Sequence, residues 1–299
     1  MNSMKPKNLL LAAGTIGLLL FWACAKNATP APPIHDTVTV HKTDTLIKID
    51  TFLKPVDTPN LKIGLLLYLP FNGSIADSSG NANPTTAVAG ATLTYDLHGY
   101  ANAAFGGTGN GERIKVTNNG SIKFDTAYSI SYDFMQNSNV GRQAHLSMVN
   151  TSNGTGPTFV TGTNVPNMTQ FDFGANDSLA GCNNSGSGQP GAMNDTTNFT
   201  PQPGSWYNAI CIYHKGIIQV YINGKLIATK TLAGTTKALL CPSSQIVIGG
   251  WWDGDLITLN GKLDEIRLYN RVLNANEIAW LSRNFQTTST KLHAVIQNR

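Results

Sequence analysis

The residues best suited to bind a ligand lie in one short stretch, Trp251-Trp252-Asp253-Gly254-Asp255. Two adjacent tryptophans among Gly and Asp residues must either enter a core or stay partly exposed. Exposed indole rings stack against the C–H faces of sugar rings, and neighbouring carboxylates bond sugar hydroxyls. We therefore predict a carbohydrate-binding site at Trp251, Trp252, Asp253 and Asp255. The alternative is that one tryptophan closes an end of the core while the other is partly exposed.

Carboxylates that could act as a general acid and a general base are few. The glutamates of the chain are Glu112, Glu265 and Glu277. Asp264 and Glu265 are adjacent, so in a regular strand their side chains point to opposite faces and cannot form a pair on one face. The motifs Gly-x-Ser-x-Gly and His-Glu-x-x-His are absent. A glycosidase or lyase would therefore need other carboxylates to converge in a cleft, such as Asp172, Asp177 or Asp195.

Charge argues against a nucleic-acid partner. The formal net charge is +4 at pH 7, but Lys and Arg balance Asp and Glu within residues 61–284. The positive surplus therefore lies outside that segment. Nucleic-acid binding requires a basic patch or stripe on the domain, and none is evident here.

The segments that must position the candidate residues are predicted to form β-structure. With 29 glycines and abundant Asn and Thr, the chain is rich in turn formers. Residues 65–71 predict a first strand, and residues 128–134 alternate apolar and polar as a half-buried antiparallel strand should. Residues 218–228 predict a hairpin, because Asn223-Gly224 between two β-rich runs suits a type I′ turn. Residues 136–205, rich in Gly, Asn, Ser and Thr, are expected to hold long loops.

The C-terminal part, residues 246–281, predicts a strand, a loop, a second strand and a short helix. Asn274 can cap the helix, and Glu277 stands three residues later, as in a capping box. Trp280 and Leu281 are then expected to pack this helix onto the rest of the domain.

Several of these segments together resemble laminin G-like, concanavalin A-like jelly-roll domains. The matching pieces are a first strand ending in Phe71-Asn-Gly, the loop Asp77-Ser-Ser-Gly-Asn81, residues 103–107 and 114–116, and the last strand Gly261-Lys-Leu-Asp-Glu-Ile-Arg-Leu-Tyr269. The resemblance covers about residues 64–284 and is weak across 136–205. It implies an all-β fold, a two-sheet antiparallel β-sandwich over residues 61–284 with a short C-terminal capped helix. It also implies that Trp206 is a buried core residue.

The resemblance carries expectations about cofactor and chemistry as well. Related domains often hold a structural Ca²⁺ with the first loop and the aspartate of the last strand, here Asp77, Asn81 and Asp264, whose oxygens suit a hard cation. The alternative is that Asp77 caps an Asx-turn and Asp264 bonds backbone amides. Glycosidases that share the jelly roll carry Glu-x-Asp-x-x-Glu on one strand. That motif is absent, so the resemblance implies a domain without catalysis.

The N-terminus predicts export. A basic start with Lys5 and Lys7 precedes an apolar run, residues 9–22, that is too short for a comfortable membrane span of roughly 20 residues. Ala23-Cys24 resembles a bacterial lipoprotein processing site, with residues 1–23 as signal peptide and Cys24 lipidated. An ordinary signal peptide or an uncleaved anchor are the alternatives, and both still export the chain.

The segments outside the domain are expected to lack a core. Residues 24–60 read as an extended, Asp-Thr-rich tether. Their alternating apolar residues could pair as a strand, although no partner is evident. Residues 285–299 read as a polar tail.

Cysteine pairing stays open at this point. Besides Cys24 the chain has Cys182, Cys211 and Cys241. In an oxidising compartment one disulfide is expected among these three, because an odd number cannot pair completely.

The leading functional prediction is a non-catalytic, lipid-anchored carbohydrate-binding module at the bacterial cell envelope. It would be an outer-membrane lipoprotein, on either the periplasmic or the surface face. A protein-interaction or adhesion domain is the first alternative, and a divergent glycosidase or lyase the second. A shallow groove of Trp and Asp favours sugar, whereas a flat apolar patch of several hundred Å² favours protein.

Overall fold

The computed structural model describes residues 37–42, 45–50, 58–150, 155–163, 169–183, 192–231 and 236–285. The chain divides into two compact units, Met1–Thr51 and Phe52–Arg299, which are treated separately below. The predicted signal peptide, the lipidation site Cys24 and residues 286–299 of the tail lie outside the described residues. Within the described residues, no helix is long and apolar enough to cross a membrane.

The N-terminal unit contains one β-hairpin. Strand β1 (Thr37–Lys42) pairs antiparallel with β2 (Thr45–Asp50). Both strands lie in the segment predicted as an extended tether. No partner was evident from the sequence, and the structure shows that the two strands of this segment pair with each other.

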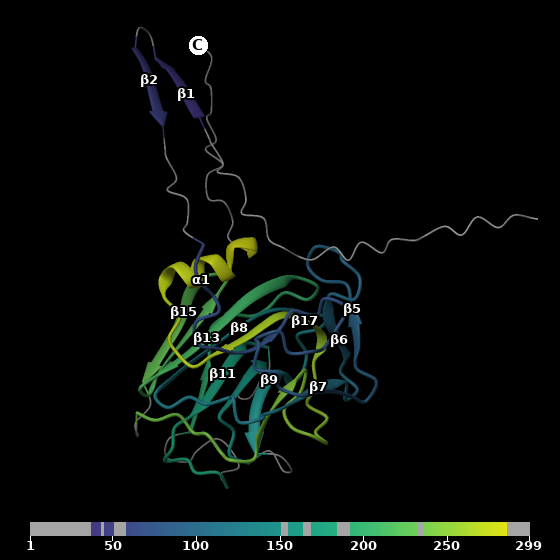
Figure 1. Cartoon of the computed structure of the whole chain (residues 1–299). Helices are drawn as coiled ribbons and strands as arrows, with labels where there is room; N and C mark the ends of the chain where they lie inside the picture. The colour runs from purple at the N-terminus through teal and green to yellow at the C-terminus, as the bar shows by residue number, and fades with distance from the viewer. Residues whose placement is uncertain are drawn as a thin grey trace, which may run out of the picture. The chain divides into compact units, whose positions relative to one another are not determined.

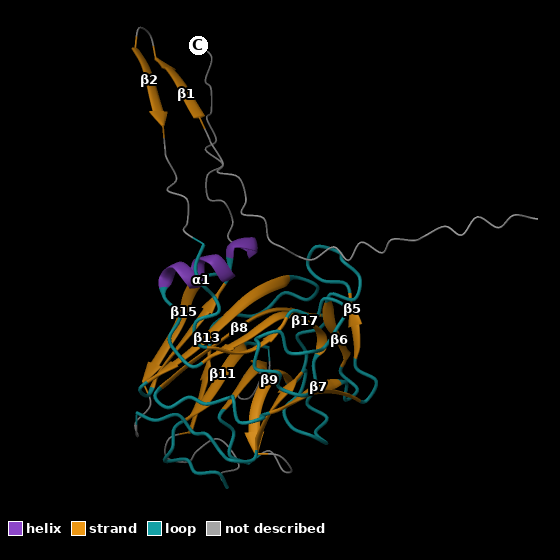
Figure 2. Ribbon diagram, viewed as in Figure 1, coloured by secondary structure: helices purple, strands orange, loops and turns teal. Residues whose placement is uncertain are grey.

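The larger unit is a sandwich of two antiparallel sheets (Figures 1 and 2), which confirms the predicted fold. One sheet has seven strands, in the order β12 (Ala192–Thr196), β11 (Phe171–Asn176), β10 (Phe159–Thr163), β9 (Gln143–Asn150), β16 (Ser244–Ile248), β7 (Arg113–Thr117) and β4 (Thr85–Val88). The other has eight, with β15 (Lys225–Thr231), β14 (Ile217–Ile222), β13 (Trp206–His214), β8 (Ala127–Gln136), β17 (Asn260–Tyr269), β6 (Ala104–Thr108) and β5 (Thr92–Thr94) in order, and β3 (Leu65–Leu69) also paired with β17.

The core forms where the alternating apolar side chains of the two sheets meet. In β8 these are Tyr128, Ile130, Tyr132 and Phe134, all buried. The half-burial predicted for this strand is wrong, because the intervening Ser129 is buried as well. Its hydroxyl donates to Arg271 O at 2.7 Å on the outer face, where the C-terminal segment covers the strand.

The segment expected to hold long loops contributes four strands, β9 to β12, to the seven-stranded sheet. Its inward positions carry the apolar side chains of Leu146, Met148, Phe159, Phe171 and Phe173. The prediction failed because β10, β11 and β12 have only five or six residues each and lie among Gly- and Asn-rich stretches, so the apolar residues of each strand give a weak signal.

Local turn and cap signals, in contrast, are confirmed. Ile222 pairs with Lys225 across Asn223 and Gly224, which have φ of 52° and 78°, as a type I′ turn requires. Helix α1 (Ala275–Leu281) begins after Asn274 with a complete capping box.

Helix α1 lies on the outer face of the eight-stranded sheet (Figure 1). It packs Ile278 and Leu281, but not Trp280, into a second apolar cluster with Ile210 and Ile212 of β13. Leu61 and Leu65, where the sandwich begins, pack against the same cluster. Both ends of the domain therefore meet on this face.

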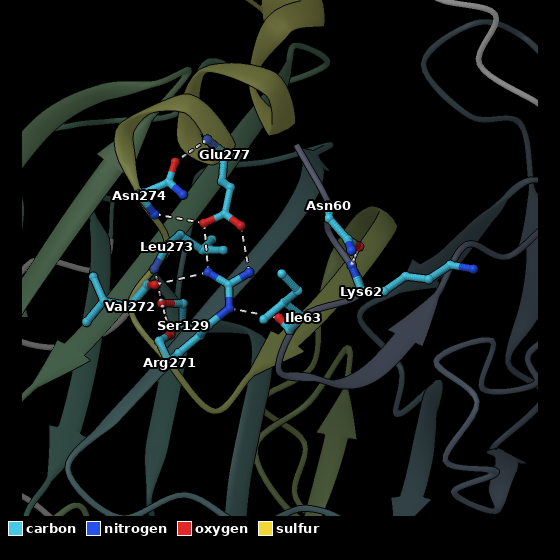
Figure 3. Close-up of polar contacts among 9 residues, drawn as sticks. All are labelled: Asn60, Lys62, Ile63, Ser129, Arg271, Val272, Leu273, Asn274 and Glu277. Atoms are coloured by element: carbon cyan, nitrogen blue, oxygen red, sulfur yellow. Dashed lines mark hydrogen bonds and ion pairs between the residues drawn. The ribbon is translucent and has the colours of Figure 1, made fainter. Parts of the chain in front are cut away.

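Arg271 ties these two ends together (Figure 3). Its Nε donates to Ile63 O at 2.8 Å, and its two Nη atoms donate to the Glu277 carboxylate at 2.7 and 2.6 Å. Glu277 also accepts from Asn274 N at 2.8 Å. Burial favours a higher pKa for Glu277, but the hydrogen bonds from Arg271 and Asn274 hold that pKa below its ordinary value.

The structure shows which cysteines form the predicted disulfide. Cys182 and Cys241 form a disulfide with Cα atoms 5.6 Å apart, and Cys211 is free and buried. Trp206 begins β13 but is only partly buried. The expectation that it is a core residue is therefore wrong.

Candidate functional site

The predicted binding stretch, Trp251 to Asp255, lies on the outer face of the seven-stranded sheet. Ser147 of β9 alternates with the core residues Leu146 and Met148, so its side chain is on that outer face. Its hydroxyl donates to Gly250 O at 3.1 Å and also to Trp251 O. The loop is thus hydrogen-bonded to the sheet face opposite the one that carries α1.

A small, shallow hollow lies beside this loop; the roughly 210 Å³ of empty space there includes open solvent. Trp251 and Ile257 line it from the loop side, and Val160 and Asp172 line it from β10 and β11. The remaining lining residues come from the start of β9 and the end of β10: Gln143, Ala144, Thr161, Gly162 and Thr163. An aromatic wall with polar groups around it is the kind of lining that a sugar ring requires.

A β-bulge shapes the floor of this hollow. Thr161 pairs with Leu146 and Gly162 with Ala144, so His145 has no partner in β10. The extra residue turns the His145 ring inward, where its centroid lies 4.8 Å from that of Phe134. Burial without a charged partner lowers the pKa of His145 from 6.5 to about 3. Only glycine fits at position 162, because a Cβ there would lie 2.0 Å from Gln143 O.

Trp251 is partly exposed and has contacts on both sides. The guanidinium of Arg142 lies 4.6 Å from the centre of its ring, and Trp252 packs edge-on at 5.4 Å. Burial lowers the pKa of Arg142, and the charge of Asp255 acts in the opposite direction. The indole Nε1 of Trp251 is buried and has no acceptor among the described residues.

The two aspartates of the loop have different surroundings. Asp253 accepts from Lys115 Nζ at 2.8 Å and from Arg113 Nη2 at 3.2 Å. The bond from Lys115 in particular lowers the pKa of Asp253. Asp255 uses Oδ1 to accept from Leu256 N at 2.7 Å, while its buried Oδ2 has no hydrogen-bond partner among the described residues. Asp253 therefore holds the loop on the sheet.

The predicted calcium ligands are engaged in hydrogen bonds. The Asp77 carboxylate accepts from Tyr68 N, from the amide and hydroxyl of Ser79, and from the backbone and side-chain amides of Asn83, at 2.8 to 3.1 Å. The Asn81 side-chain amide donates to backbone carbonyls of β3. Asp264 accepts from Glu265 N at 2.8 Å. This arrangement favours the Asx-turn alternative, and calcium binding by these residues stays a prediction.

Of the candidate catalytic carboxylates, Asp172 and Asp177 do not form a pair. Asp172 lines the hollow, but Asp177 lies five residues further along the chain, roughly 16 Å away at the rise of a strand. Asp195 is in β12, where only the backbone is described. Paired carboxylates in glycosidases lie within about 9.5 Å of each other.

Asp264 and Glu265 lie in the other sheet. The register of β17 with β8 shifts between Asp264 and Arg267, and Glu265 has a φ of 53°, so the strict alternation expected for this pair does not hold. The Glu265 carboxylate accepts from Arg267 Nη2 at 2.6 Å and from the Tyr68 hydroxyl.

Sequence reasoning missed the residues that complete the hollow. Arg142, Gln143 and Ile257 are ordinary in type and have no motif around them. They reach Trp251 only because the turn after β8 and the loop after β16 are joined by hydrogen bonds, including Asn260 N to Gln143 Oε1 at 3.0 Å.

Comparison with protein families agrees with this fold. The Laminin_G_3 family model, described as the concanavalin A-like lectin/glucanases superfamily, matches residues 108–279, more than half of the chain. The chain belongs to this superfamily. No curated protein matches the sequence with significance.

Solved structures with the same fold include binding domains of toxins. The binding domain of Paraclostridial Mosquitocidal Protein 1 is 19% identical and has a TM-score of 0.55, with 75% of this chain and 53% of that chain covered. The binding domain of botulinum neurotoxin DC, solved in complex with SialylT, is 18% identical with a TM-score of 0.53, covering 76% and 53%. At these identities the likeness shows the fold, and this superfamily member spans about half the length of either neighbour.

Proposed function

We propose that this protein is a non-catalytic carbohydrate-binding module and that Trp251 is its central contact. The observation that carries the proposal is the partly exposed indole of Trp251 on the wall of a hollow that is lined otherwise mostly by polar groups of β9, β10 and β11. A sugar ring can contact the indole while its hydroxyls bond polar groups of the lining. The glycan ligand bound by the neurotoxin DC domain supports this class of ligand.

The positions and partners of the acidic residues agree with binding without catalysis. The only aspartate lining the hollow is Asp172, and the described residues place no second carboxylate beside it there. The carboxylates of Asp253 and Glu265 are each bonded to cationic side chains. A divergent glycosidase or lyase is the alternative that a second carboxylate at the hollow would support.

Attachment to the cell envelope through Cys24 is part of the proposal. The start of the sandwich unit packs beside α1, on the outer face of the eight-stranded sheet, whereas the hollow lies on the seven-stranded sheet. A tether leaving from the first face would keep the second face accessible to ligands. Metabolic labelling with a fatty-acid analogue, lost in Cys24→Ser, would test the anchor.

The test of the proposed function is a glycan array probed with the chain from Ala25 onward. We expect binding that Trp251→Ala abolishes, while Trp280→Ala on the opposite face has no effect. An array on which the folded protein binds nothing would contradict the proposal and favour the adhesion alternative, for which a pull-down of protein partners is the next experiment.

Calcium binding can be tested with the same protein, the chain from Ala25 onward. A structural Ca²⁺ at Asp77, Asn81 and Asp264 would raise the unfolding temperature relative to chelator, because a ligand bound only by the folded state stabilises it. The rise would be lost in Asp264→Asn. If chelator changes nothing, the hydrogen bonds of Asp77 are sufficient to order its loop.

A further inference from the structure

The hollow beside Trp251 is too small to enclose a sugar. Roughly 210 Å³ of empty space lies there, and this figure includes open solvent. Pockets that bury most of a small ligand have volumes of about 300–1,000 Å³. A single sugar unit at this site would therefore keep much of its surface in water and bind weakly.

The loop that carries Trp251 crosses the outer face of the seven-stranded sheet. One residue from each of four neighbouring strands marks its path, and these residues lie opposite one another in register: Val160 of β10, Ser147 of β9, Val247 of β16 and Lys115 of β7. Val160 lines the hollow, the Ser147 hydroxyl donates to Trp251 O, and Lys115 Nζ donates to Asp253. The loop thus extends from the hollow across three spacings between strands, or about 14 Å.

Hydrogen bonds hold this loop in place, whereas its two indole rings are partly exposed. Asp253 accepts from Lys115 Nζ at 2.8 Å, and Asp255 N donates to Trp252 O at 3.2 Å. Trp252 packs edge-on against Trp251, with ring centres 5.4 Å apart. Because the backbone is already ordered, a ligand that lies along the loop does not have to order it on binding.

We propose that this open surface binds an internal segment of a polysaccharide, with consecutive sugar units over the hollow, Trp251 and Trp252. The inference rests on the proposed function and specifies the class of its ligand. Several weak contacts along one sugar chain can add up to a usable affinity, because the chain loses its overall translational and rotational freedom only once. A site that recognises the end of a glycan has to enclose a terminal unit, and the shallow hollow provides no such enclosure.

The experiment uses the chain from Ala25 onward and begins with native gels that contain a soluble β-glucan, xylan, galactomannan or pectin. Fragments of two and of six units are prepared from the polysaccharide that retards the protein most, and both are titrated by calorimetry. We expect the six-unit fragment to bind at least about tenfold more tightly, the factor that one further aromatic contact of about 1.4 kcal/mol supplies. Per sugar unit, the intact polysaccharide should compete as well as the six-unit fragment, because its internal units are the ligand.

The decisive variant is Trp252→Ala, which should bind the two-unit fragment nearly as the wild type does and lose most of the gain with the six-unit fragment. Binding of the shorter fragment also shows that the variant is folded. The matched control is Trp280→Ala on α1, which should behave as the wild type at both lengths.

Equal affinity of the wild type for the two fragments would overturn the inference, as would an unchanged gain in Trp252→Ala. Binding to glycans on the array without retardation by any of the polysaccharides would overturn it too, because the protein would then recognise glycan ends. If neither the polysaccharides nor the array glycans bind, the proposed function itself fails, which is a distinct result.

Discussion

The outer faces of the two sheets are covered in different ways. On the eight-stranded sheet, α1 buries Ile278 and Leu281 against β13. An ion pair between Arg271 and Glu277 lies next to this apolar contact. On the seven-stranded sheet, the loop at Trp251 leaves a hollow beside β10 and β11. The first face is covered by a helix of the same chain, whereas the second carries an open hollow. Stability and binding should therefore respond to different substitutions.

The largest effect is expected at the Arg271–Glu277 pair. Glu277→Ala removes the second half of the capping box and leaves the Arg271 guanidinium without its carboxylate, at a site where the Glu277 side chain is 5% exposed. We expect the free energy of unfolding to fall by about 2–4 kcal/mol, measured by urea denaturation. Saccharide binding should be unchanged under conditions where the variant is folded.

The control for that prediction is an exposed ion pair. Lys237 and Asp125 are 3.6 Å apart with side chains 66% and 70% exposed. Asp125→Ala should cost less than about 1 kcal/mol. Equal losses in both variants would mean that the α1 face contributes no more than an ordinary surface contact.

The second prediction concerns pH and the core beneath the hollow. The pKa of His145 is about 3 in the folded chain and 6.5 ordinarily, so between these values the unfolded chain takes up a proton that the folded chain does not. Stability should fall as pH decreases through this window, by about 1.4 kcal/mol per pH unit below 6.5. Between pH 7 and 5 this amounts to about 2 kcal/mol.

His145→Phe should remove this part of the pH dependence. Phenylalanine suits the aromatic surroundings, and the Tyr132 hydroxyl keeps its bond to Thr161 Oγ1 at 2.9 Å. The measurement is urea denaturation at both pH values for the two proteins. The same loss in the variant would assign the pH dependence to other groups, of which Glu277 titrates at lower pH because its pKa is below its ordinary value.

The two faces also differ in how much the sequence predicted. Asn223-Gly224 and the capping box at Asn274 were predicted because a few neighbouring residues determine a turn or a cap. The last strand was predicted because its pattern resembles a family. His145 at a bulge, and the pairing of Cys182 with Cys241, were not predictable in this way, since no local pattern marks the bulge between β9 and β10 and the two cysteines are 59 residues apart.

The candidate site was predicted only in part, because some of its residues are brought together by the fold and not marked by a local sequence pattern. Trp251 stood out by residue type, and the structure places it on the hollow. Asp253 was predicted as a sugar contact, whereas its carboxylate is bonded to Arg113 and Lys115 of β7. Arg142 carries no signal in sequence, because its role follows only from the approach of two loops.

The third prediction separates the adjacent tryptophans. Trp251 lines the hollow and Trp252 does not, although the two pack against each other. Trp251→Ala should weaken saccharide binding by at least about tenfold, corresponding to about 1.4 kcal/mol, and Trp252→Ala by less. Titration calorimetry with the saccharide selected on the array provides the measurement. A larger loss in Trp252→Ala would move the contact out of the hollow and onto the loop surface.

The smallest effect is expected at Asp253, which joins the loop to the sheet. Asp253→Asn removes the charge that pairs with Lys115 and Arg113, and the Asp253 side chain is 37% exposed. Pairs of this exposure contribute about 0.2–1 kcal/mol, so binding should weaken by about two- to fivefold through a less ordered loop. Because the pKa of Asp253 is below its ordinary value of 3.8, this contribution should persist as pH falls from 7 to 4 and disappear only below that. A loss as large as that of Trp251→Ala would show instead that the Asp253 carboxylate leaves its cations to bind the sugar, as the sequence alone suggested.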